Sequence, residues 1–138
     1  MIDDYGSWDE TPLHQAVRQA WVEECRALLG NGADPNAIDS YGSTPLSSLL
    51  LRAELMLDNG IEFSRLRTRE QFERELIEIL VMLLDNGATY EKATQHYMFN
   101  VLPKVKLWYR DQVFNWHVMN MEIATAPALA PTRKAARL

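Results

Sequence analysis

Residues 11–16 of the chain read Thr-Pro-Leu-His-Gln-Ala, and residues 44–46 repeat Thr-Pro-Leu at an interval of 33 residues. A threonine hydroxyl can cap the first turn of a helix, and a proline directly after the cap needs no hydrogen bond from its nitrogen. Each Thr-Pro-Leu therefore predicts the start of a helix. A repeat of this length is typical of proteins built from stacked supersecondary units.

The residues after each Thr-Pro-Leu sequence, which we call a box, complete one predicted repeat unit. Leu13, Ala16 and Val17 share one helical face, and after a turn near Ala20 a second amphipathic helix is predicted over 22–29. Residues 35–43 are rich in turn formers and predict an extended hairpin that leads into the next box. We therefore expect a hairpin finger, a short helix, a turn and a longer helix in each unit.

Two similar endings close the predicted units. Leu-Leu at 28–29 precedes Gly-Ala-Asp at 32–34, and Leu-Leu at 83–84 precedes Gly-Ala-Thr at 87–89. Glycine readily adopts the left-handed conformation that ends a helix. The second ending comes 22 residues later than a period of 33 requires, so the sequence predicts an insertion within the second unit.

These motifs resemble the ankyrin repeat. Residues 11–16 are similar to that family's Thr-Pro-Leu-His-x-Ala box, residues 32–37 to its Gly-Ala-Asp-hydrophobic-Asn-Ala ending, and residues 39–46 to its finger and next box. The resemblance covers residues 6–50 closely and residues 72–89 moderately. It implies an all-α repeat fold, an ankyrin-like helix-turn-helix solenoid with short β-hairpin fingers.

The resemblance also assigns structural roles and shows departures. It implies that His14 hydrogen-bonds the loops of neighbouring repeats and fixes their stacking. Ser47 stands where the second box would have histidine, so we expect that bridging histidine to be missing there. Asp9 replaces the glycine that the family prefers in its finger, as expected of a repeat that begins a stack.

The insertion is predicted to lengthen both helices of the second unit. We expect the first helix to reach about Leu57, an inserted loop to span 58–68, and the second helix to begin at about Arg69. Thr68 can cap that helix, with Gln71 placed for a reciprocal bond. Its predicted core stripe is Phe72, Leu76, Ile79, Leu80, Leu83 and Leu84.

No third box follows residue 89, and we predict a helical cap instead. Pro103 separates two predicted helices, 91–102 and 104–123. Their aromatic residues could form the core of a capping unit or an exposed anchor patch: Tyr97, Phe99, Trp108, Tyr109, Phe114 and Trp116. The predicted organisation is one domain over 1–123, with repeat 1 at about 6–38, repeat 2 at about 39–89, a cap at 90–123 and a flexible tail at 124–138.

The chain has 138 residues and a net charge of −5, which fits one acidic globular domain. Residues 1–60 hold ten acids and three bases, a charge of −7, whereas residues 61–138 carry +2. This balance argues against nucleic-acid binding, which depends on neutralising phosphates. The acidic half could steer a basic protein partner or could be a solvated face.

The cysteine count, the first five residues and the length of the apolar stretches bear on the compartment and on membrane association. A single cysteine, Cys25, excludes an intrachain disulfide and fits a reducing compartment. The first five residues lack a basic start and an apolar run, so we expect no secretory signal. Apolar stretches such as 79–84 are far shorter than the roughly 20 residues that span a bilayer. We therefore expect a cytoplasmic protein that does not enter a membrane.

The sequence gives little support for catalysis. Cys25 lies on the apolar face of its predicted helix, so we expect a buried core cysteine. His96 and His117 have no second ligand at metal-binding spacing, and no phosphate-cradling glycine loop is present. We therefore expect no cofactor, no metal and no enzymatic activity. An enzyme hypothesis would have to rest on His117 or Asp111.

The resemblance implies a binding surface on the fingers and first helices. Carried over residue by residue, it predicts these partner-binding residues: Ser7, Trp8, Glu10, Arg18, Gln19, Ser40, Tyr41, Ser43 and Arg52. Trp8 and Tyr41 match in the 33-residue register, although either ring could be packed instead. Leu51 falls at a comparable position and could also be packed. Arg65, Arg67 and Arg69 make the inserted loop a second candidate, or a solvated basic loop.

These features predict a non-catalytic module for protein–protein interaction. One hypothesis is a small inhibitor or immunity-type protein that binds and blocks another protein, such as a basic enzyme or toxin. The alternative is an adaptor or scaffold subunit that links two protein partners.

Overall fold

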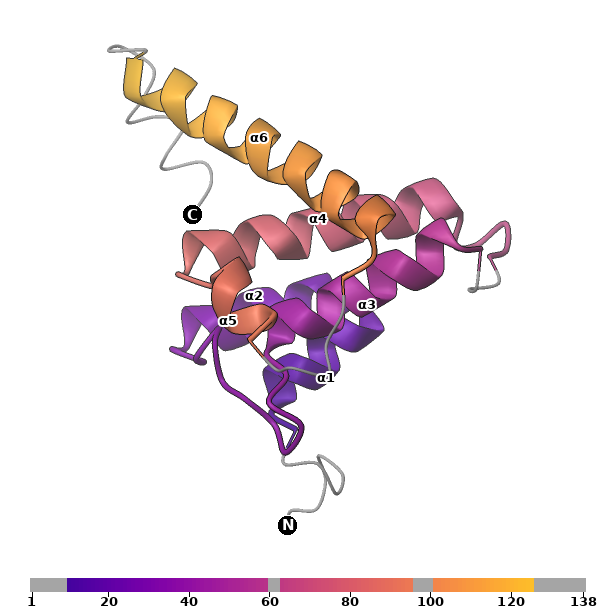
Figure 1. Cartoon of the computed structure of the whole chain (residues 1–138), viewed down its shortest axis with the longest axis horizontal. Coiled ribbons are helices and arrows are strands. Elements are labelled where there is room, and N and C mark those ends of the chain that lie inside the picture. The colour runs from indigo at the N-terminus through magenta and orange to yellow at the C-terminus, as the bar shows by residue number, and fades with distance from the viewer. Residues whose placement is uncertain (1–9, 60–62, 96–100, 126–138) are drawn as a thin grey trace. The chain divides into compact units, whose positions relative to one another are not determined.

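The computed structural model describes residues 10–59, 63–95 and 101–125, and over these residues the chain forms helices and no strand (Figure 1). The chain divides into two compact units, residues 1–105 and 106–138. The predicted all-α repeat is confirmed. In chain order the helices are α1 (Pro12–Gln19), α2 (Val22–Gly30), α3 (Pro45–Leu57), α4 (Arg69–Asp85), α5 (Tyr90–Ala93) and α6 (Pro103–Thr125).

The α1–α2 pair forms as the sequence predicts. The hydroxyl of Thr11 accepts a hydrogen bond from the backbone N–H of His14 at 3.2 Å and caps α1. α1 ends at Ala20, whose left-handed φ of 58° turns the chain back into α2. Leu13 and Val17 are buried on the inner face of α1. The apolar spacing therefore determines which side of the helix enters the core.

The second repeat has the lengthened helices that the insertion predicts. α3 ends at Leu57, and α4 begins after Thr68, whose hydroxyl accepts from the N–H of Gln71 at 3.1 Å. Within the unit 1–105, α3 lies against α1 and α4, and α2 lies against α1 and α4 (Figure 1). The fully buried side chains between these helices include Leu46, Leu49, Leu50, Leu76, Ile79, Leu80 and Leu83.

Buried polar bridges fix how each repeat sits on the next. The ring of His14 accepts from Thr11 N–H at its Nδ1 atom, so its Nε2 atom carries the proton and donates to the carbonyl of Ser43 at 2.7 Å. The predicted bridging role of His14 is confirmed. Ser47 makes the equivalent bridge in the second repeat, because it accepts from Thr44 N–H and donates to the carbonyl of Ala93 at 2.5 Å. Ser47 therefore makes the bridge that a histidine would make at this position of the repeat.

The loops that end the two repeats also bond to each other. The side chain of Asn36 donates to the carbonyl of Gly87 at 3.0 Å and accepts from the N–H of Thr89 at 3.2 Å. Arg26 on α2 pairs with Glu78 on α4 at 2.8 Å. The 22-residue insertion therefore leaves the stacking of the two repeat endings intact.

The finger, residues 34–43, differs from the predicted β-hairpin. It reverses by turns: Asp39 N–H donates to Ser43 O, and Gly42 N–H donates to Asp39 O, both at 3.0 Å. The carboxylate of Asp39 also accepts from the N–H groups of Tyr41 and Ser43, both at 2.9 Å. These side-chain bonds take donors that a strand ladder would need, so the described residues of the finger contain no strand.

The helical cap differs from its prediction in the first of its two helices. α5 ends at Ala93, whereas a helix over 91–102 was predicted; residues 101 and 102 are not helical, and 96–100 lie outside the described residues. Thr94 is the C-cap of α5, and both its N–H and its hydroxyl donate to the carbonyl of Tyr90, at 3.0 and 2.9 Å. α6 begins at Pro103 and reaches Thr125, close to the prediction. The remainder of the predicted tail, like Tyr97 and Phe99, lies outside the described residues. The predicted domain boundaries stay predictions.

Candidate functional site

The finger presents large apolar side chains to solvent. Tyr41 is 55% exposed and Ile38 is 64% exposed. Both are held on a loop whose backbone is fixed by Asp39, and Gly42 supplies the positive φ of 80° that the turn needs. An exposed apolar side chain on an ordered loop can bind a partner with little loss of conformational entropy. Tyr41 is therefore placed as a contact residue of this kind would be.

The outer face of α3 continues this apolar character. Leu51 is 47% exposed, and Leu55, one helical turn later on the same face, is 40% exposed. The packed alternative for Leu51 is therefore wrong. The sequence did not single out Leu55 or Ile38, although the spacing of Leu55 from Leu51 was a signal that could have identified it. We use the name apolar face for these four exposed side chains, Ile38 and Tyr41 on the finger and Leu51 and Leu55 on α3.

Some of the predicted partner-binding residues are exposed, and others are half-buried or bonded to other residues of the chain. Gln19 and Ser40 are exposed, Arg18, Ser43 and Arg52 are half-buried, and Ser7 and Trp8 lie outside the described residues. Glu10 is only 8% exposed and forms a bidentate ion pair with Arg18. Glu10 is thus not displayed to a partner, because its carboxylate is occupied in holding Arg18.

Arg52 occupies an unusual electrostatic position. Its Nε–H donates to the backbone carbonyl of Arg18 at 2.7 Å, which ties α3 to the end of α1. Burial lowers the pKa of the Arg52 guanidinium, and the positive charges of Arg18 and Arg67 lower it further. The structure therefore brings together two of the predicted helix arginines and one arginine of the inserted loop.

The three arginines in and next to the inserted loop, residues 58–68, differ in their surroundings. Arg65 and Arg69 are exposed. Arg67 instead lies over the ring of Phe72 at 5.1 Å and donates to Glu75 at 2.6 Å. Glu75 was not identified from the sequence, since only the fold brings a residue of α4 back against the loop that precedes it.

Cys25 is fully buried, as predicted. Burial raises the pKa of its thiol from 9.0 to about 12, and the negative charge of Glu24 adds to this effect. A thiol with such a raised pKa is a poor nucleophile at neutral pH. The structure thus places Cys25 in the core of the repeat rather than in a reactive site.

We expect the raised pKa of Cys25 to make folding stability depend on pH. Between pH 9 and pH 12 the unfolded chain loses the thiol proton while the folded chain keeps it, so stability falls as pH rises. The loss should approach about 1.4 kcal/mol per pH unit within this window. Urea unfolding of the wild type and of Cys25→Ala at pH 8, 9.5 and 10.5 would measure it. Parallel pH profiles for the two proteins would contradict the prediction.

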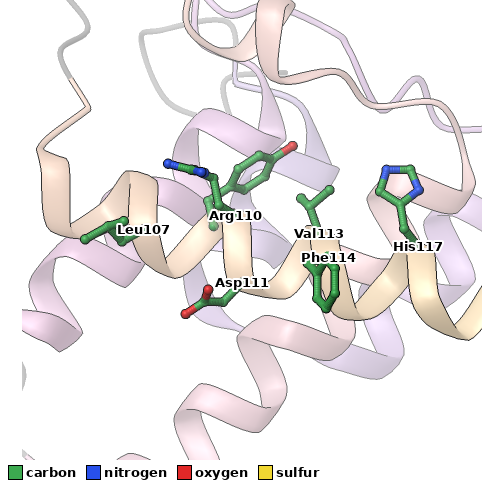
Figure 2. Close-up of a pocket in the computed structure, with 7 residues that line it drawn as sticks. Leu107, Arg110, Asp111, Val113, Phe114 and His117 are labelled. Atoms are coloured by element: carbon green, nitrogen blue, oxygen red, sulfur yellow. The ribbon is translucent and has the colours of Figure 1, made fainter.

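The residues that an enzyme hypothesis would require do not converge. Figure 2 shows the hollow beside α6, with Asp111 and His117 directed to opposite sides of the helix. Among the residues that the structure describes, no three His, Cys, Asp or Glu side chains gather as a metal site would need. No helix in the same residues is both long and apolar enough to cross a bilayer.

Comparison with known proteins gives two findings. Residues 13–53 match the family described as ankyrin repeats (many copies). The chain is also similar to cyclin-dependent kinase 4 inhibitor B of Rattus norvegicus, with 36% identity over 61 residues. The match covers 41% of this chain and 47% of that protein, so the chain spans about half the length of the curated relative.

Proposed function

Because residues 13–53 belong to the ankyrin-repeat family, we propose that this chain binds another protein through its finger and first helices and blocks that protein's activity. The observation that carries the proposal is the apolar face, whose side chains stand on an ordered finger and on the outer face of α3. Exposed apolar groups on a rigid repeat are typical of a docking surface.

Two further observations support inhibition as the result of binding. The similar rat protein is named as an inhibitor of cyclin-dependent kinase 4, which supports inhibition as the outcome of binding. In this chain Asp111 and His117 diverge, and Cys25 is buried, so binding is the output that the described residues can deliver. We infer a cytoplasmic inhibitor that has no catalytic step of its own.

We further propose that the inhibited protein is a basic enzyme, as an immunity-type protein that neutralises a toxin would require. The chain carries −5 overall and −7 within residues 1–60, which contain the finger and α1–α3. A field of this sign accelerates association with a basic partner and disfavours acidic ones. The association rate should therefore fall as the salt concentration rises.

Tyr41→Ala tests the proposed face. We expect the variant to bind the captured partner more weakly by roughly 1–4 kcal/mol, because an aromatic side chain in the centre of an interface is a frequent hot spot. Its free energy of unfolding should change by less than about 0.5 kcal/mol, since the ring is 55% exposed. The partner is first captured from a lysate of the source cells with the full chain, and affinity is then measured by titration.

Phe114→Ala provides a matched control, because Phe114 is also aromatic, is 66% exposed, and lies on α6 rather than on the finger or the first helices. It should leave affinity unchanged. Addition of the full chain should also lower the activity of the captured partner in proportion to complex formed. Unchanged affinity for Tyr41→Ala, or a collapse of its stability, would refute the assignment of the face.

An adaptor that links two partners is the second candidate, and the separate unit 106–138 favours it. The hollow beside α6 is lined partly by apolar side chains, among them Leu107, Val113 and Phe114 (Figure 2). An adaptor should capture two unrelated proteins, one sensitive to Tyr41→Ala and the other to Phe114→Ala. An inhibitor should capture one protein and lower its activity.

A further inference from the structure

Three arginines from separate elements share one region of the repeat: Arg18 at the end of α1, Arg52 on α3 and Arg67 on the inserted loop. We call them the arginine cluster. The bond from Arg52 Nε to the carbonyl of Arg18, 2.7 Å long, holds the Arg52 guanidinium beside α1. The charges of both other arginines act on Arg52, which shows that all three positive groups are close enough to interact.

The carboxylates near the cluster balance only two of these charges. Glu10 pairs with Arg18, with Nη2 and Oε1 separated by 3.0 Å, and Glu75 pairs with Arg67 at 2.6 Å. In the part of the chain that the structure describes, no carboxylate pairs with Arg52. Among the described groups of the cluster, two negative charges therefore face three positive ones.

Several N–H groups of the cluster make no hydrogen bond to the described residues. The Nε–H of Arg67 is buried and meets no acceptor among the described residues. Arg52 uses its Nε–H on a backbone carbonyl, and its two terminal Nη groups make no further bond within those residues. A buried donor normally has an acceptor, and guanidinium N–H groups bind anions in strong, charge-assisted hydrogen bonds.

We propose that the arginine cluster is the receptor for one carboxylate of the partner protein, an aspartate or glutamate side chain bound by the Nη groups of Arg52. This inference rests on the proposed function and specifies the chemistry of its contact. The planar fork of a guanidinium matches a carboxylate in two parallel hydrogen bonds. The one positive charge in excess among the described groups suits a carboxylate of charge −1 better than a phosphate group of charge near −2.

The surroundings of Arg52 should strengthen such a bond. Leu51 and Leu55 lie on the outer face of the same helix, and both are exposed in the free chain. A partner that covers them also removes water from the adjacent ion pair, which lowers the local dielectric and strengthens the attraction. The acidic residue of the partner should therefore have apolar neighbours. Arg52 then provides specificity within a chain whose overall charge is negative.

A direct test uses acetate as the probe. The side-chain Nε–H signals of the full chain are followed by NMR during titration with sodium acetate, with sodium chloride adjusted to hold ionic strength constant. We expect the Arg52 signal to shift saturably, with an apparent affinity about tenfold higher than that of Arg74, an exposed arginine on α4. Inorganic phosphate is the second probe. Equal affinities at Arg52 and Arg74, or tighter binding of phosphate than of acetate, would overturn the proposal.

The captured partner supplies a second test. Arg52→Glu and Arg74→Glu change the net charge equally, so only a specific contact separates them. We expect Arg52→Glu to weaken the complex about 100-fold or more, Arg52→Lys to give an intermediate loss, and Arg74→Glu to have an effect below about threefold. Circular dichroism checks that each variant is folded. Partner binding that is insensitive to Arg52→Glu overturns the inference alone, whereas failure to inhibit any partner contradicts the proposed function and leaves the acetate result to decide the site.

Discussion

Replacing His14 with alanine is expected to reduce the free energy of unfolding by about 3–5 kcal/mol. His14 is completely buried, and its ring joins the N–H of Thr11 to the carbonyl of Ser43 in the next repeat. The substitution leaves two part-buried backbone groups without this partner, at up to about 1–3 kcal/mol each, and opens a cavity where the ring stood. A loss of this size is a large share of the stability of a small domain.

Urea unfolding of the full chain measures the loss, with Gln15→Ala as the matched control on the same helix. Gln15 is half-exposed, and its replacement should cost less than about 0.5 kcal/mol. Hydrogen exchange should also show faster exchange in the finger of His14→Ala, because the finger loses its bond to α1. A loss below about 1 kcal/mol would mean that His14 does not hold the repeats together.

Leu76→Ala is expected to destabilise the chain by about 2–5 kcal/mol, the range for removing a fully buried leucine side chain. Leu76 is 0% exposed and lies in the part of α4 that the insertion adds to the repeat. The loss would show that the added turns belong to the hydrophobic core. An insertion that merely extended into solvent would give no such effect.

The same insertion provides the control for this substitution. Leu66→Ala removes the same atoms from a side chain that is 91% exposed, so it should change the unfolding free energy by less than about 0.5 kcal/mol. Thermal unfolding of both variants beside the wild type is sufficient. Equal effects of the two substitutions would contradict the packing described for α4.

The proposed docking face is compatible with the way the repeats are held together. Bridges at His14, Ser47 and Asn36 join each repeat to its neighbour through backbone groups. A substitution at Tyr41 can therefore alter binding without unfolding the repeat, whereas a substitution at Arg52 also removes its bond to the carbonyl of Arg18. In a stack of this kind, the binding surface can vary while the scaffold is retained.

Local sequence was sufficient where one helix or turn decides the structure. Thr11, Thr44 and Thr68 each cap a helix as predicted, and the spacing of leucines identified the buried face of α4. Such features depend on residues three or four positions apart, so they can be identified without knowledge of the fold. The predicted β-hairpin finger differed because the carboxylate of Asp39 takes the backbone donors of the loop. The helix predicted over 91–102 ends at Ala93.

By itself the sequence determined the repeat, its capped helix starts, the inserted loop and the buried position of Cys25, because these follow from residue periodicity and helix capping. The bridging role of His14 was implied by the resemblance to the ankyrin repeat. Only the tertiary structure decided that Ser47 replaces a histidine bridge, that Glu10 is occupied by Arg18, and that Arg52 lacks a carboxylate among the described residues. These outcomes depend on which side chains meet across a distance of 8–46 residues in the chain. Such residues meet only because one helix pair packs on the next. The local spacing of residues in the sequence does not specify that packing.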